Sequence, residues 1–325
     1  MKPSHHVLAA ALLGGMALTA LPSLAQDANY PSRPVTLVVG YPAGGSTDLT
    51  GRTLGEALAK QLGVPVVIEN VGGAGGAIGA QKVANAAPDG YTLLVGANNE
   101  VAISRLVTKT TKYDLKDFTP IGMVASQPMV LVASPSAGVK NIDQFIAKVK
   151  AAPGKTSYGS SGVGTGLHLA GEMVKQRAGL FMTHIPYRGV APLTTDLIGN
   201  NLEFGVFVLS SGLPHIKSGK VIALGTTEAK RSPMTPDIPA LGEHPALKGM
   251  EIGTWFALLG PAKLPDAVTS KLKTALAEAL KSPECRQKME ASGSTVATGA
   301  VDIGPFLQAE VDKYRKIVQF AKIEQ

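Results

Sequence analysis

The chain has 325 residues, 45% of them hydrophobic and 17% charged, and a formal net charge of +7 at neutral pH. This hydrophobic content excludes a disordered chain, and the length suffices for two domains of ordinary size. The 31 lysines and arginines are scattered singly along expected helices, which argues against a nucleic-acid or anionic-membrane partner.

The first residues have the pattern of a secretory signal peptide. Lys2 gives a basic start, residues 7–21 are apolar, and the small residues Ser23 and Ala25 mark a cleavage site. The apolar run contains glycines and is shorter than the roughly 20 residues of a membrane-spanning helix. We therefore expect residues 1–25 to be removed and the mature protein to be exported to the periplasm.

Strands and helices alternate in the first part of the mature chain. The predicted elements are strands at 35–41, 65–70 and 91–97 and helices at 48–62 and 77–86. This βαβαβ order predicts a parallel sheet. The following apolar stretch, residues 120–133, lacks a clear period and is the expected place for the chain to cross into a second lobe.

The alternation then restarts. The further predicted elements are helices at 142–152, 167–178, 192–198, 266–281 and 303–319 and strands at 155–161, 182–188, 202–208, 219–227 and 252–261. The restart predicts two α/β lobes, the first formed by residues 26–125 and 226–325 and the second by residues 126–225. Ligands of open α/β sheets bind beyond the carboxyl ends of the strands, so two facing lobes form a binding cleft.

Two segments rich in glycine and hydroxyl groups stand at strand-to-helix junctions, one in each lobe. The candidate ligand residues in them are Tyr41, Ala43, Gly44, Gly45 and Ser46 in the first, and Ser160, Ser161, Gly164, Thr165 and His168 in the second. A helix start offers unpaired backbone N–H groups and partial positive charge, and glycine lets a ligand approach the main chain. Either segment alone is also explained as an ordinary capped turn. Together they predict a carboxylate site, because several charge-assisted hydrogen bonds of roughly 1.5–3 kcal/mol each give micromolar affinity without an arginine.

Motif spacing argues against phosphate binding and acyl transfer. Ile78 stands where the dinucleotide fingerprint needs its third glycine, Val149 where a Walker loop needs its first, and Val163 breaks a nucleophile elbow. We therefore expect no catalytic residue and no cofactor. The alternative from another class is a secreted serine hydrolase that uses Ser161 and His168.

The sequence offers no metal or disulfide framework. The histidines at 168, 184, 215 and 244 lack the spacing of metal ligands, so we expect no metal. Cys285 has no partner cysteine and is interpreted as an inert, partly buried thiol. His168 differs from the other histidines because it follows the second glycine-rich segment, and we expect it to contact the ligand.

A resemblance to a known family runs through the whole mature chain. It is carried by ordered segments that include "YPSRPVTLVVGYPAGGSTD", "PVVIENVGGAGGAIGA", "YGSSGVGTGLHLAGE" and "HIPYRGVAPLTTDLIG". These segments resemble the extracytoplasmic solute receptors of tripartite tricarboxylate transporters, also called Bug-type receptors. The resemblance implies a monomeric, two-lobed periplasmic binding protein of the type II Venus flytrap fold that delivers a small carboxylate to a membrane permease. It also implies that the loops at 43–46 and 160–165 grip one carboxylate through N–H groups, hydroxyls and ordered waters.

One segment departs from the family pattern. Such receptors commonly carry an acidic or amide pair where this chain has Phe207 and Val208. This apolar wall argues against amino-acid ligands and, with Tyr41, predicts an aromatic carboxylate. Terephthalate fits if its second carboxylate is held by hydroxyls, by Asn98 or by His168. The alternative is an aliphatic di- or tricarboxylate, with Phe207 packed beneath the cleft.

Overall fold

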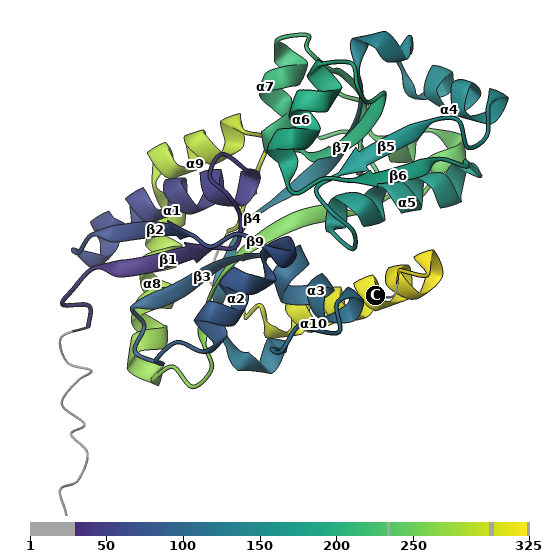
Figure 1. Cartoon of the computed structure of the whole chain (residues 1–325). Helices are drawn as coiled ribbons and strands as arrows, with labels where there is room; N and C mark the ends of the chain where they lie inside the picture. Colours follow the sequence, from purple (N-terminus) through teal and green to yellow (C-terminus); the bar gives the residue numbers. More distant parts are fainter. Residues whose placement is uncertain (1–29, 233–234, 299–301, 324–325) are drawn as a thin grey trace, which may run out of the picture.

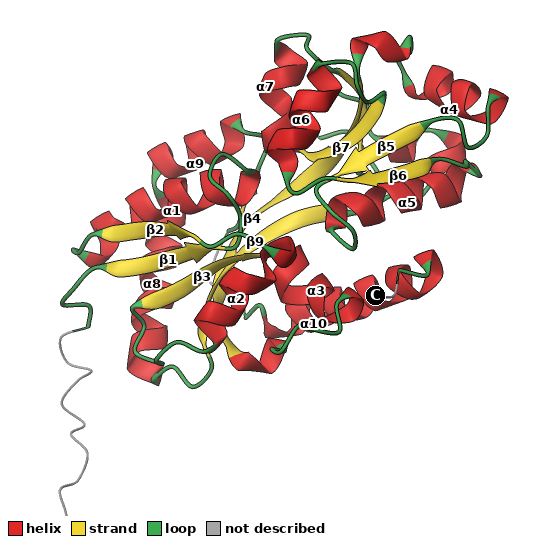
Figure 2. Cartoon of the chain, viewed as in Figure 1, coloured by secondary structure: helices red, strands yellow, loops and turns green. Residues whose placement is uncertain are grey.

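The computed structural model describes residues 30–232, 235–298 and 302–323. The expected signal peptide, residues 1–25, lies outside this part of the chain. Figure 1 shows two α/β halves, and β4 and β9 run from one half into the other. Figure 2 shows helices on both sides of the strands in each half. Within the described residues, no helix is both long and apolar enough to cross a membrane.

The strands are β1 (Val35–Val39), β2 (Val66–Asn70), β3 (Thr92–Ala97), β4 (Phe118–Ala133), β5 (Ser157–Ser160), β6 (Thr183–Pro186), β7 (Phe204–Val208), β8 (Ile222–Thr226), β9 (Gly253–Pro261) and β10 (Thr295–Val296). The α-helices are α1 (Ser46–Leu62), α2 (Ala77–Ala84), α3 (Ser104–Val107), α4 (Ile142–Ala151), α5 (Gly166–Ala178), α6 (Val190–Ile198), α7 (Leu209–Lys217), α8 (Asp266–Lys281), α9 (Pro283–Ala291) and α10 (Gly304–Ala321). The short helical turns are η2 (Ala74–Gly76), η3 (Asn99–Ile103), η4 (Leu115–Asp117), η5 (Pro135–Ala137), η6 (Leu241–Glu243) and η7 (Pro245–Leu247).

The first half is built on the parallel strands β1, β2 and β3. Strand β1 lies between the other two, with Val35 opposite Val66 and Thr36 opposite Thr92. The expected parallel βαβαβ unit is therefore confirmed. Because helices cover both faces of these strands, Leu37 and Val38, which point to opposite faces, are both fully buried. From β1 the chain first adds β2 on one side and then β3 on the other side. Ligands of such sheets bind at the carboxyl ends of the strands at this change of side, between β1 and β3.

Strand β4 occupies the stretch that was expected to cross between lobes. Residues 118–128 pair with β9, whereas residues 129–133 pair with β7 and residues 130–133 also pair with β8. One continuous strand thus belongs to both halves. Its hydrophobic pattern shows no alternation because most of its residues are buried whichever face they point to.

The chain returns to the first half beside this crossing. The N–H of Thr227 donates to Met129 O (2.8 Å), and the N–H of Ile252 donates to Thr227 O (3.0 Å). Gln127 lies at the same place and connects the halves by accepting from Ser210 N (3.1 Å) and donating to Ser294 Oγ (2.7 Å). The lobe boundaries at 125/126 and 225/226 stay predictions.

The second half is built on β5, β6 and β7. Strand β5 pairs in parallel with β6 and with β7, and α5 and α6 follow β5 and β6 as the sequence predicts. Three helices were not predicted, α3, α7 and α9. Helix α7 contains Gly212 and Pro214, which disfavour a helix in isolation, and it forms because its apolar face packs on β4 and β7.

Helix α10 packs against elements of both halves. It contacts η3 and α3 of the first half and α5 of the second. The buried Tyr314 anchors it, since its hydroxyl accepts from Asn98 Nδ2 (3.0 Å) and donates to Gly253 O (3.2 Å). Glu310 adds a second anchor by accepting from Trp255 Nε1 (2.8 Å).

Candidate ligand-binding site

The two predicted segments stand at the carboxyl ends of parallel strands in different halves. We call residues 42–45, between β1 and α1, the first loop, and residues 161–165, between β5 and α5, the second loop. The halves meet next to them, where Gly166 N donates to Asn99 Oδ1 (2.6 Å). Gly75 also approaches the second loop, because a Cβ on Gly75 would lie 4.0 Å from Thr165 Cγ2. The carboxyl ends of the two parallel strand sets therefore face each other.

A buried carboxylate holds the first loop in place. Asp48 Oδ2 accepts from Gly44 N (2.9 Å) and Arg52 Nε (3.0 Å), and its Oδ1 accepts from Asn70 Nδ2 (2.9 Å). Burial opposes ionisation of Asp48, but these hydrogen bonds outweigh burial and lower the pKa of the carboxyl. The N–H of Gly44 is thus already paired, in contrast to its expected role as a free donor.

The free donors of the first half lie one to three residues further along. Gly45 is the N-cap of α1 in an extended conformation (φ −83°, ψ 170°), and no side chain caps the helix. The first N–H groups of a helix have no partner within it. Across the described residues, neither the Ser46 nor the Thr47 hydroxyl has a hydrogen-bond partner. This helix start therefore offers backbone N–H groups and two hydroxyls to an anion.

Tyr41 ties three connections of the first half together. Its hydroxyl lies 2.8 Å from Gly75 O and 2.7 Å from Glu100 Oε2, while Glu100 Oε1 accepts from Ala97 N (2.7 Å). Burial raises the pKa of Glu100 to about 7 and raises the pKa of Tyr41. The tyrosine hydroxyl is thus occupied by protein partners.

The three hydroxyl groups at the second loop differ in the hydrogen bonds that they make within the protein. Thr165 caps α5, since its Oγ1 accepts from His168 N (3.3 Å) and donates to Gly162 O (2.8 Å). Ser160 Oγ accepts from Gly162 N (3.2 Å) and is fully buried. Ser161 makes one long contact, from its Oγ to Thr165 Oγ1 (3.4 Å). Ser161 therefore carries the least engaged hydroxyl of this loop.

Two stacked histidines lie behind the second loop. The rings of His168 and His184 are parallel within 10°, with centroids 3.7 Å apart. His168 Nδ1 accepts from Gly164 N (3.0 Å), and its Nε2 lies 3.7 Å from Glu172 Oε1. His184 Nε2 lies 2.7 Å from Ser160 Oγ. Burial lowers the pKa of His168 to about 4 and that of His184 to about 3, so both rings are neutral at physiological pH.

The hydrolase arrangement is not formed. Ser161 makes no hydrogen bond with His168 among the described residues, because the two ring nitrogens of His168 face Gly164 and Glu172. The serine–histidine pair that does form, Ser160 with His184, is unsuited to attack a substrate because Ser160 is fully buried.

Other predicted ligand residues serve the packing of the protein. Asn98 is buried and donates to Tyr314, so it anchors α10. Gly164 has φ +72°, and a Cβ there would lie 2.6 Å from Val107 Cγ2, so its glycine is required by close contact with α3. Phe207 is fully buried in the core of the second half, against residues that include Val130. Phe207 therefore reaches no ligand surface here and gives no support to an aromatic ligand.

The remaining side chains add no metal centre. Over residues 30–232, 235–298 and 302–323, no three His, Cys, Asp or Glu side chains gather in a way that could hold a metal ion. Cys285 is buried, and burial raises the pKa of its thiol, as expected of an inert cysteine.

A cavity of about 880 Å³ lies between α7 and α9, lined in part by Lys217 and Arg286, and it contains none of the predicted ligand residues.

Four residues that shape the site were not predicted from the sequence. Asp48 carries a readable signal, an acidic residue in the first helical turn four positions after Gly44. Asn99 adjoins the predicted Asn98, and spacing alone does not decide which of the two faces the second loop. Glu100 and His184 carry no such signal, because their partners come from other strands or loops.

Comparisons with known proteins agree on one family. Residues 50–323 match the family described as "Tripartite tricarboxylate transporter family receptor". The chain is 32% identical to BugT from Bordetella pertussis over 295 residues, which cover 89% of this chain and 90% of BugT. Two solved structures from Rhodopseudomonas palustris are similar to it. Rpa4515 with adipate has a TM-score of 0.86 and 31% identity and covers 90% of this chain and 99% of its own. MatC with bound malate has a TM-score of 0.82 and 28% identity and covers 89% of this chain and 100% of its own.

Proposed function

Because the chain belongs to the receptor family of the tripartite tricarboxylate transporters, we propose that it binds a small aliphatic dicarboxylate for delivery to a membrane permease. Membership confirms the resemblance found in the sequence and the α/β fold of a periplasmic binding protein. The family consists of solute-binding receptors and not of enzymes, and its solved members include periplasmic proteins. The serine hydrolase alternative is therefore not supported.

One observation supports the proposed site: α1 of the first half starts without a side-chain cap at the carboxyl end of β1, as the second loop stands at the carboxyl end of β5 in the other half. In this proposal one carboxylate of the ligand accepts from the N–H groups of Gly45 and Ser46 and from the hydroxyls at the start of α1. The Ser161 hydroxyl donates to the same group from the second loop. Charge-assisted hydrogen bonds of this kind are worth roughly 1.5–3 kcal/mol each.

Several residues take supporting roles in this proposal rather than contacting the ligand. Gly44 and Ala43 shape the first loop, with Gly44 in a left-handed conformation (φ +89°) and bonded to Asp48. Tyr41 holds the first loop to η2 through its hydroxyl. Ser160 and His168 hold the second loop through hydrogen bonds, Ser160 with His184 and His168 with Gly164.

An aliphatic body is preferred over terephthalate for two reasons. Phe207, which led the sequence analysis to an aromatic ligand, is fully buried. Two structural relatives, moreover, were solved with the aliphatic diacids adipate and malate. We propose that the second carboxylate is held through ordered waters and hydroxyls.

Isothermal titration with malate, adipate, succinate, citrate, benzoate and terephthalate tests the proposal. We expect the tightest binding, in about the micromolar range, for one of the aliphatic diacids. Terephthalate binding more tightly than every aliphatic acid would refute the aliphatic assignment. Binding of none of the six acids would refute the carboxylate site itself.

The receptor is further proposed to act as a monomer whose halves rotate about β4 near Gln127 and Met129. Light scattering coupled to size exclusion, with and without ligand, tests the first statement. Small-angle scattering tests the second, and a radius of gyration that stays unchanged on ligand addition would contradict it.

A further inference from the structure

The histidine pair behind the second loop has a geometry that specifies its protonation. A backbone N–H is only a donor, so the hydrogen bond from Gly164 N requires His168 Nδ1 to be an unprotonated acceptor. A neutral His168 then carries its proton on Nε2, the nitrogen that faces Glu172 Oε1. Protonation of His168 on Nδ1 removes the acceptor and breaks the bond to the loop.

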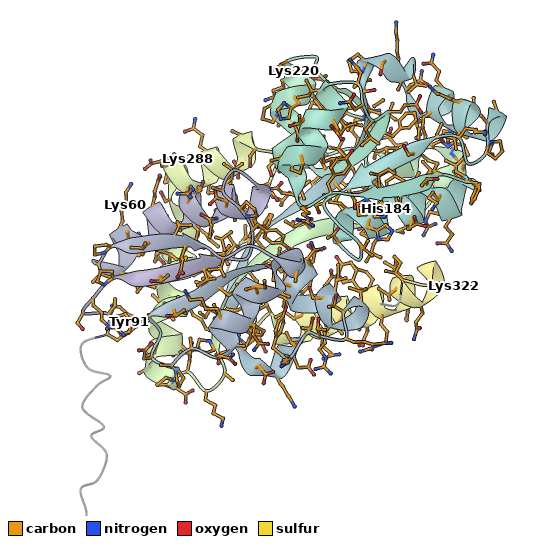
Figure 3. The ribbon with its side chains drawn as sticks, viewed as in Figure 1. Lys60, Tyr91, His184, Lys220, Lys288 and Lys322 are labelled. Carbon is orange, nitrogen blue, oxygen red and sulfur yellow. The ribbon has the colours of Figure 1, made fainter. Side chains whose placement is uncertain are left out.

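His184 completes the support from the next strand. His184 lies on β6, which pairs with β5. Its Nε2 lies within hydrogen-bond distance of the Ser160 hydroxyl, at the end of β5. Ser160 in turn is bonded to both the N–H and the C=O of Gly162. Figure 3 shows His184 on the side of the second half that is turned toward α10. The two rings thus hold the loop at Gly162 and at Gly164.

Burial and the charge of Lys175 favour the neutral form of both rings, whereas the charge of Glu172 favours protonation of His168. Lys175 Nζ and the Tyr158 hydroxyl both donate to Glu172 Oε1 (2.7 and 2.8 Å), so this carboxylate is already engaged. Among the described parts of the elements packed on α5, strands β4 and β7 and turn η7 carry no ionisable side chain, and β5 contributes Tyr158. Helix α10 also packs on α5, and the charges that shift the pKa values of the two rings come from α5 and from the rings themselves, not from Glu310, Asp312, Lys313, Arg315 or Lys316 of α10. Two imidazolium ions 3.7 Å apart would also repel each other.

We propose that His168 and His184 are positioning residues that hold the second loop in its ligand-binding conformation only while His168 is neutral and protonated on Nε2. The inference rests on the proposed carboxylate site, because it explains how Ser161 and the start of α5 are kept in place for that ligand. It also makes carboxylate binding sensitive to acid, independently of any titration of the ligand.

Matched substitutions separate the acceptor from the packing. His168→Leu keeps an apolar side chain of similar size without an acceptor, whereas His168→Asn retains an oxygen close to the position of Nδ1. His184→Gln likewise retains a polar atom close to Nε2. His215→Leu on α7 is the control, because the His215 side chain has no hydrogen bond within the described residues.

The decisive readouts need no ligand. Nitrogen-15 NMR of the wild-type protein is expected to show His168 as the Nε2–H tautomer at about neutral pH, with a pKa well below the ordinary value of 6.5. Amide exchange at Gly164 is expected to quicken about tenfold or more in His168→Leu and to be largely restored in His168→Asn. An Nδ1–H tautomer in the wild type would overturn the inference even if every variant failed to fold.

Binding gives the third readout. We expect His168→Leu to weaken the affinity for malate about tenfold or more, His168→Asn to recover most of it, and His215→Leu to leave it unchanged. Wild-type affinity in a folded His168→Leu would overturn the inference. If the wild type binds no carboxylate at all, the proposed function fails, while the tautomer and the Gly164 exchange rate still decide whether the pair holds the loop.

Discussion

The substitution Gly45→Val tests the first loop, because the structure separates its effect on binding from its effect on folding. Gly45 has an extended backbone (φ −83°, ψ 170°) that a β-branched residue adopts readily. A Cβ at this position meets only Pro42 O, at 3.9 Å, which is ordinary van der Waals contact. The neighbouring Gly44 is unsuitable for the test, because its φ of +89° makes any side chain strained.

The expected change in stability is small. Replacing an N-cap glycine with valine costs roughly 1 kcal/mol of helix stability. Valine also lowers the conformational entropy of the unfolded chain, which stabilises the folded protein by roughly 0.4–1 kcal/mol. The two terms nearly cancel, so the free energy of unfolding is expected to change by less than about 1 kcal/mol.

The expected change in affinity is large. The valine side chain covers the unpaired N–H groups at the start of α1, and each charge-assisted hydrogen bond lost is worth roughly 1.5–3 kcal/mol. This corresponds to a loss of affinity of roughly 10- to 150-fold for each bond. Gly45→Ala, with its smaller side chain, is expected to fall between the wild type and Gly45→Val.

Calorimetric titration with malate and urea unfolding measure the two effects. Ser282→Val places the same side chain at the start of α9, away from the loops, and serves as the control that should leave affinity unchanged. A folded Gly45→Val protein that binds malate as tightly as the wild type would refute the role of the first loop.

Three further predictions concern the second half. Ser161→Ala is expected to weaken malate binding by roughly 1–3 kcal/mol with little loss of stability; an unchanged dissociation constant would show Ser161 to be a turn residue only. Phe207→Ala is expected to lower the free energy of unfolding by roughly 3–5 kcal/mol, because the ring is fully buried, while the order of preference among the acids stays the same; a changed order would place Phe207 at the ligand. Burial lowers the pKa values of His168 and His184 to about 4 and about 3, below the ordinary value of 6.5. Above pH 6.5 both rings are neutral in the folded and unfolded states and contribute nothing, whereas below it the unfolded chain binds protons that the folded protein excludes, so stability falls from about pH 6.5 toward pH 3. Urea unfolding across this range, compared with a double variant carrying His168→Asn and His184→Gln, measures the effect, and an equal slope in both proteins would contradict it.

The sequence by itself determined the order of most elements and the two loops. The helix at 266–281 begins and ends where its periodicity predicts, and β1, β2 and β3 form the expected parallel unit. These features depend on local pattern, since a repeating apolar face and a glycine at a helix boundary are readable along the chain. The proposal that the two helix starts bind an anion follows in the same way from nearest neighbours.

The tertiary structure alone decided which groups in those loops remain free. Gly44 and Gly45 are equivalent in the sequence, but a folded Asp48 pairs with the first and leaves the second open. Phe207 stands where a polar wall was expected, and its direction is set by packing in the core of the second half. His168 is held by a histidine from the neighbouring strand, sixteen residues away in the sequence. Such pairings depend on strand order and on which face each side chain takes, and neither quantity is encoded in the spacing of residues along the chain.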